Sequence, residues 1–144
     1  MKFLNKTLPI LSILIYIISV SQIAFKTGYM GEIRIYYSYE VLLVGGISFL
    51  GGGIPETFVW SANFWYLLSL FFTKNKKYKE AIIFSIIATL ISISFMLWKE
   101  VLWSESGSTA SILSLEIGYF LWVISMIILL VNSILLFYKL KGYI

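Results

Sequence analysis

Long apolar stretches alternate with short polar ones along the chain. A helix of about 20 apolar residues crosses the roughly 30 Å hydrocarbon core of a bilayer. Four stretches approach that length, at about residues 7–25, 55–73, 81–98 and 117–138. The pattern predicts an all-α fold, an integral membrane four-helix bundle that forms one transmembrane domain over residues 1–144.

Three polar segments separate the predicted spans. Residues 26–54 and 99–116 are expected to be outer loops, and residues 74–80 an inner loop. Tyr36, Tyr37 and Tyr39 fall in the first outer loop, and tyrosines beside a span are typical of the headgroup level. The first outer loop should therefore lie on the membrane surface.

Residues 41–73 are apolar almost throughout but are interrupted by a glycine-rich segment that leads into Pro55 and Glu56. As one helix they would be about 50 Å long, too long for one span and too short for two with a turn. Proline in the first turn and an acid beside it favour a helix start, so the second span should begin at Pro55. Residues 41–50 then form an interrupted outer segment, either interfacial or partly re-entrant, in which Gly45 and Gly46 permit close approach of a neighbour.

The first span has a second interpretation. Lysines precede it and Ser19-Val20-Ser21 has the small residues of a cleavage site, as in a secretory signal peptide. Apolar character continues to Phe25, which favours a retained membrane helix.

The charges orient the predicted bundle. Positive residues accumulate on the cytoplasmic side of membrane proteins. The inner segments hold eight lysines and one acid, whereas the outer segments hold three basic residues and six acids. The inner lysines are Lys2, Lys6, Lys74, Lys76, Lys77, Lys79, Lys139 and Lys141. We therefore expect cytoplasmic N- and C-termini in a bacterial cytoplasmic (inner) membrane.

Composition excludes several classes of chemistry. The chain is 60% hydrophobic and 12% charged, and it has no cysteine, histidine or aspartate. Disulfides, zinc–thiolate sites, iron–sulfur clusters and histidine catalysis are thereby excluded. We expect no catalytic residues, no cofactor and no metal. The net charge of +4 is explained by the inner lysines and does not indicate nucleic acid.

Four polar residues in or beside the spans are candidate interaction residues. Glu56 and Glu116 stand at predicted outer helix starts, where they would complement the helix dipole or, as the alternative, face each other in an outward cavity. Asn63 and Asn132 lie within spans, where interhelical hydrogen bonding is favoured over a polar pathway.

A stripe of small residues marks one face of the third span. Its members are Ala81, Ser85, Ala88, Thr89 and Ser92. Small side chains let membrane helices pack closely, so this stripe should face the bundle rather than line a pore.

Two short aromatic motifs carry a resemblance. The stretch from Trp60-Ser61-Ala62-Asn63 to the lysine-rich turn, together with Gly118-Tyr119-Phe120-Leu121-Trp122, resembles a pattern in small four-helix bacterial inner-membrane proteins of unknown function. The resemblance covers about residues 45–135. It implies a multi-pass inner-membrane protein and transfers no site residue.

Three hypotheses of function follow. The first is a non-catalytic protein that binds another membrane protein, as an accessory, assembly or immunity-type factor. The alternative is a small-solute or ion transporter or channel that works as a homo-oligomer. A lipid-modifying enzyme ranks last because no acid/base pair supports it.

Overall fold

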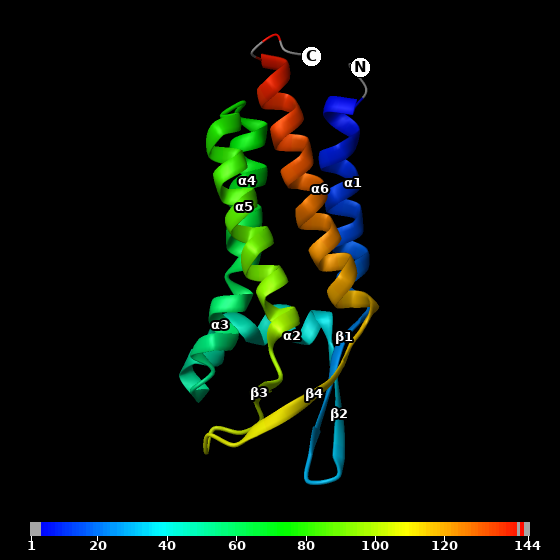
Figure 1. The fold of residues 1–144 in the computed structure, drawn as a ribbon, viewed down its shortest axis with the longest axis vertical. Coiled ribbons are helices and arrows are strands. Elements are labelled where there is room, and N and C mark those ends of the chain that lie inside the picture. Colours follow the sequence, from blue (N-terminus) through cyan, green and yellow to red (C-terminus); the bar gives the residue numbers. More distant parts are fainter. Residues whose placement is uncertain (1–3, 141, 143–144) are drawn as a thin grey trace.

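The fold is mixed α/β, and the predicted all-α fold is wrong. The computed structural model describes residues 4–140 and Gly142. Helices form a bundle, and residues assigned to the two outer loops form a four-stranded antiparallel sheet in the order β2-β1-β4-β3. The sheet closes the end of the bundle opposite to the two termini (Figure 1).

Four helices make the bundle. Helix α6 packs against α1 and α5, and α4 packs against α5. The turn between α4 and α5 lies at the same end as the termini (Figure 1). The bounds are Leu4–Val20 for α1, Ala62–Lys74 for α4, Tyr78–Ser94 for α5 and Ile117–Leu140 for α6.

Helix α1 ends at Val20, five residues before the predicted end of the first span. Strands β1 (Ile23–Tyr29) and β2 (Glu32–Tyr37) follow as an antiparallel hairpin. Met30 and Gly31 join them with positive φ at both positions, 47° and 87°, which a type I′ turn requires. The apolar residues at the start of β1 therefore belong to a strand.

The second outer segment completes the sheet. Strands β3 (Glu100–Leu102) and β4 (Thr109–Leu115) form another antiparallel hairpin. Strand β4 also pairs with β1, so segments from both predicted outer loops join in one sheet. The serine-rich stretch predicted as a flexible tip is in part a strand.

Residues 38–60 form a collar between the bundle and the sheet. It consists of α2 (Ser38–Val44), the 3₁₀ helix η1 (Gly45–Gly51) and α3 (Ile54–Trp60). A Cβ added to Gly45 or Gly46 would meet the Trp60 ring at 2.5 or 3.0 Å, and the Trp60 indole N–H donates to the Leu42 carbonyl at 2.8 Å. The two glycines therefore give room for a tryptophan of the same collar.

The predicted second span is two helices. Its start is confirmed, since α3 has Pro55 at its beginning and Glu56 in its first turn. The Ser61 hydroxyl donates to the Phe58 carbonyl at 2.6 Å, a local bond that bends helices. Helix α4 starts directly after this residue and runs along the bundle, whereas α3 lies at its end (Figure 1).

The third and fourth predicted spans agree with the structure. Among the described residues, two helices are long and apolar enough to cross a membrane, Tyr78–Leu97 and Ile117–Leu140. The first includes the short 3₁₀ helix η2 (Phe95–Leu97). These lengths permit membrane association and do not by themselves establish it.

Polar side chains fill much of the bundle interior, and large apolar ones cover its surface. The fully buried serines are Ser12, Ser69, Ser85, Ser92, Ser125 and Ser133. All five residues of the predicted small stripe are buried on α5, which confirms that this face packs. Outward positions include Ile17, Leu67 and Leu90, which are 60%, 59% and 63% exposed. Soluble proteins show the opposite distribution.

Candidate functional site

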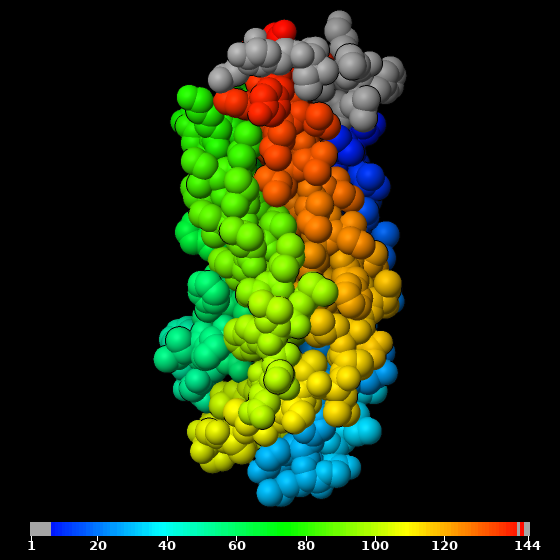
Figure 2. Space-filling model, viewed as in Figure 1, coloured from blue at the N-terminus to red at the C-terminus, as the bar shows by residue number. Residues whose placement is uncertain are grey.

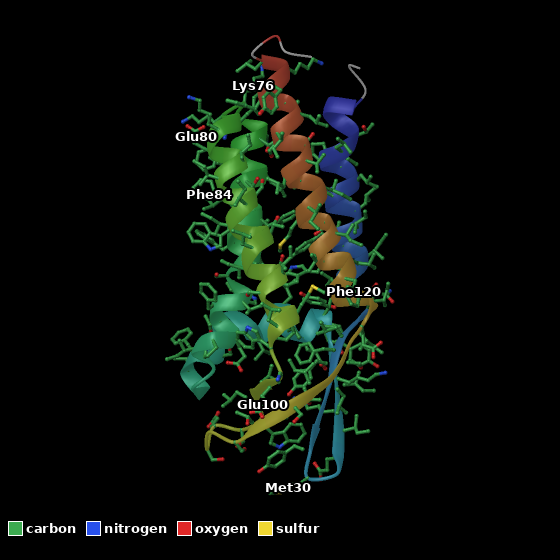
Figure 3. All side chains as sticks on the ribbon, in the orientation of Figure 1. Met30, Lys76, Glu80, Phe84, Glu100 and Phe120 are labelled. Atoms are coloured by element: carbon green, nitrogen blue, oxygen red, sulfur yellow. The ribbon has the colours of Figure 1, made fainter. Side chains whose placement is uncertain are left out.

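A cavity of about 470 Å³ lies between the bundle, the collar and the sheet. This volume is within the roughly 300–1,000 Å³ of small-molecule sites. Most of its wall is apolar, with side chains such as Phe25, Val59, Phe95 and Tyr119. Figure 3 shows this junction crowded with side chains from the collar, the strands and the ends of α5 and α6.

Asn63 closes the inner end of the cavity. Its side-chain oxygen accepts hydrogen bonds from the Tyr16 hydroxyl at 2.9 Å and the Trp122 indole N–H at 2.8 Å. Its amide nitrogen donates to the Trp60 carbonyl at 2.9 Å. Asn63 thus connects α1, α6 and the collar, which is the interhelical role that its position predicts.

Glu56 ties the collar to the sheet. Its carboxylate accepts a hydrogen bond from the Leu102 backbone N–H at 2.7 Å, so α3 and β3 are joined at the cavity wall. The helix-start interpretation holds for its position, but the carboxylate is also used in a contact 46 residues away along the chain.

Glu116 lies at the joint between β4 and α6 and makes an ion pair with Lys26 of β1 at 3.0 Å. The Ser114 hydroxyl donates to the same carboxylate at 2.7 Å. The Ser114 hydrogen bond, followed by the Lys26 contact, lowers the pKa of Glu116 below its ordinary value. Glu56 and Glu116 have different partners, and only Glu56 lines the cavity.

Asn132 lies apart from the cavity, on the half of α6 nearer the C-terminus. It is 1% exposed, and its amide nitrogen has no hydrogen-bond partner within the described part of the chain. Its carbonyl side is not brought to Asn63, so the structure does not join the two asparagines in a polar pathway.

Two cavity residues carry no signal in the sequence. The Ser38 hydroxyl lines the cavity, is buried and has no hydrogen-bond partner among the described residues. Gly118, also in the wall, has no space for a Cβ, which would overlap that hydroxyl and the Ile23 carbonyl. Only the meeting of α2, β1 and α6 makes these two positions special.

The outer end of the cavity carries charge. Arg34 of β2 lines it, with its guanidinium 4.8 Å from the centre of the Tyr36 ring. Arg34 makes no ion pair with any described residue. Glu40 lies nearby in the lining, but its carboxylate accepts hydrogen bonds from the Tyr37 N–H and the Tyr39 hydroxyl.

These groups suit binding rather than catalysis. No group of three or more His, Cys, Asp or Glu residues that could hold a metal occurs in residues 4–140 and 142. The acids of the lining are engaged in hydrogen bonds that hold the structure together. What the cavity offers a ligand is an apolar wall, an unpaired guanidinium and one free hydroxyl.

Comparisons with known proteins found no matching family model, no similar curated protein and no similar solved structure. The resemblance to small bacterial inner-membrane proteins therefore stays an expectation.

Proposed function

We propose that the chain is a multi-pass membrane protein that acts, without catalysis, by binding another membrane protein through its sheet. The single observation that carries the proposal is the contrast between an apolar-surfaced bundle and a sheet with one free, exposed edge strand. The four spans would be α1, α3 with α4, α5 extended by η2, and α6.

The distribution of side chains supports the membrane part. In lipid, large apolar side chains belong on the surface, and small or polar ones mediate helix contacts. The Ser69 and Ser85 hydroxyls lie 2.5 Å apart across α4 and α5, and the Ser12 hydroxyl donates to the Ser125 carbonyl at 2.7 Å. Such contacts satisfy polar groups inside the bundle while the apolar exterior faces lipid.

Charge supports an orientation with the sheet outside the cytoplasm. Lys76 and Glu80 lie at one end of the molecule, and Glu100 and Met30 at the other (Figure 3). Residues 74–80 carry four lysines, whereas residues 26–54 and 99–116 carry three basic and six acidic residues, a difference of minus three. Basic segments stay on the cytoplasmic side, which suits a bacterial inner membrane. Lys2, Lys141 and the side chain of Lys6 lie outside the described part.

The sheet offers a surface for a protein partner. Strand β2 is an edge strand, it contains no proline, and five of its six residues are exposed. Ile33 and Ile35 are 68% and 41% exposed beside Leu113 at 54%. Natural proteins usually protect such edges with prolines, lysines or short strands. An unprotected edge accepts an extended segment of another chain as an added strand.

The partner chemistry follows from charge. The sheet end is acidic overall, and Glu105 is exposed on the loop between β3 and β4. A basic, extended segment of another membrane protein therefore complements it. The alternative of an oligomeric transporter has no comparable support, because Asn63 is engaged by Tyr16, Trp60 and Trp122.

The test is site-specific photo-cross-linking in cells, with the photoreactive residue at Ile33 and, as a control, at Ile83, an exposed position of α5. We expect one heterologous partner from position 33 and none from position 83. The pair Ile33→Glu and Ile35→Glu should abolish its co-purification, whereas Ile33→Val and Ile35→Val should keep it. A partner that survives the glutamate pair, or a second copy of the chain as the sole product, would contradict the proposal.

A further inference from the structure

The cavity beneath the sheet has a composition that points to a ligand distinct from a protein partner. Its wall is mostly apolar and its volume is about 470 Å³. It extends from Asn63 in the bundle to Arg34 on the sheet. We propose that it binds a single-chain anionic amphiphile of the long-chain fatty acid class, with the chain along the apolar wall and the carboxylate at Arg34.

The inner end favours an apolar chain terminus. Asn63 accepts two hydrogen bonds and donates one within the protein, so its carbonyl oxygen needs nothing from a ligand. Phe25, Phe95 and Tyr119 form a continuous aromatic wall, with Phe95 centred 5.3 Å from Phe25 and 5.7 Å from Tyr119. A hydrocarbon chain gains from burial against such a surface and leaves no polar protein group without a partner.

The outer end favours an anion. Arg34 is held over Tyr36, which in turn stacks on Phe25 with 4.7 Å between ring centres. Its charge is not neutralised by any described acid, although the acidic side chains Glu40 and Glu56 line the same cavity. Those two carboxylates are held by Tyr37, Tyr39 and Leu102. A guanidinium in a partly apolar setting binds a carboxylate well.

The cavity also provides a free donor between its two ends. The Ser38 hydroxyl is buried, lines the wall and has no partner in the described part of the chain. Buried hydroxyls are rarely left unsatisfied. A ligand or a water molecule that accompanies it would supply the missing hydrogen-bond acceptor.

The collar connects the cavity to the lipid phase in our membrane assignment. Leu43, Ile47 and Leu50 are 75%, 57% and 75% exposed, so the collar presents an apolar outer surface. An amphiphile that enters from the bilayer keeps its chain in apolar surroundings throughout. The volume holds one chain, which favours a single-chain ligand over a two-chain phospholipid.

Tryptophan fluorescence tests the proposal directly because Trp60, Trp103 and Trp122 line the cavity. Dibrominated stearic acid, a fluorescence quencher, is titrated at pH 9 into the purified full chain in nanodiscs. We expect saturable quenching that unbrominated stearate reverses. Quenching that does not saturate, or that stearate does not reverse, would overturn the proposal.

Three further arms separate the site from its alternatives. Val41→Phe fills the cavity from a half-buried position and should remove the saturable component. Arg34→Gln should raise the Kd for the brominated acid by about fivefold, as expected for one partly exposed charge contact, and leave that for the brominated alcohol unchanged. Equal loss for acid and alcohol would overturn the role of Arg34. Saturable quenching by brominated phospholipid that stearate cannot displace would overturn the single-chain ligand.

Discussion

The bundle and the sheet end of this molecule solve opposite problems. Between α4 and α5 the contact is a pair of buried serines, with the large aliphatic residues on the outside. At the sheet end the buried residues are large and apolar, with Phe25, Phe95 and Val101 in one cluster, as in a soluble core. The difference teaches that one chain is built for two solvents, and that the joint between its two parts carries the greatest constraint.

The largest expected effect is at that joint. Gly118→Ala places a methyl group against the Ser38 hydroxyl and the Ile23 backbone, and backbone cannot move aside cheaply. Overpacking of this kind costs about 1–3 kcal/mol. Thermal unfolding in detergent measures it. Gly51→Ala is the control, because its Cβ would meet only the flexible side chain of Glu105 at 3.4 Å; equal loss in both variants would show that the joint is not tight.

A second comparison uses the two asparagines within the helices. Asn63→Leu leaves the Tyr16 hydroxyl and the Trp122 indole N–H without their acceptor, at a cost of about 1–3 kcal/mol. Asn132→Leu removes an amide nitrogen that has no partner in the described part of the chain, and should be neutral or stabilising. Denaturation of both variants side by side measures the difference, and an equal effect would contradict these assignments.

A smaller effect is expected inside the bundle. Ser85→Ala removes the hydroxyl contact with Ser69, although Ser69 keeps its bond to the Ala81 carbonyl at 2.9 Å. Hydrogen bonds between membrane helices contribute about 0.6 kcal/mol on average. A double-mutant cycle with Ser69→Ala in lipid bicelles isolates the coupling. A coupling of zero would mean that the helices are held by packing alone.

The smallest effect concerns pH at the sheet end. The pKa of Glu116 is lowered by Ser114 and Lys26, so its contribution to stability is present above the ordinary pKa of a glutamate and is lost as pH falls through the lowered value. The melting temperature of the native chain should fall more than that of Glu116→Gln in this acidic range. Parallel curves for the two proteins would show that the carboxylate adds no pH-dependent stability.

The two regions also differ in how far the sequence reveals them. Helix α6 was predicted almost to its ends because a long apolar run has few alternatives in a membrane. Residues 23–25 are apolar in either a helix or a strand, so the end of α1 and the start of β1 were missed. The alternation in Glu32-Ile33-Arg34-Ile35 is short, and the pairing of β1 with β4 joins residues about 85 positions apart.

The candidate site was only partly predictable for a related reason. Asn63 stood out because an amide in a span needs partners. Its partners Tyr16 and Trp122 depend on the rotation of α1 and α6, which an apolar pattern on all sides does not define. Ser38 and Gly118 are ordinary residues in the sequence, and they become special only where three elements meet.

The central claim, a membrane bundle with its sheet on the outer side, is tested most directly by labelling single cysteines. The chain has no cysteine of its own. Ser106→Cys lies on the β3–β4 loop, Asn75→Cys in the α4–α5 turn and Leu67→Cys on the exposed side of α4. In sealed right-side-out vesicles, a membrane-impermeant maleimide should label position 106 at once, position 75 only after permeabilisation, and position 67 only after detergent extraction. Equal labelling of all three positions in intact vesicles would contradict the account.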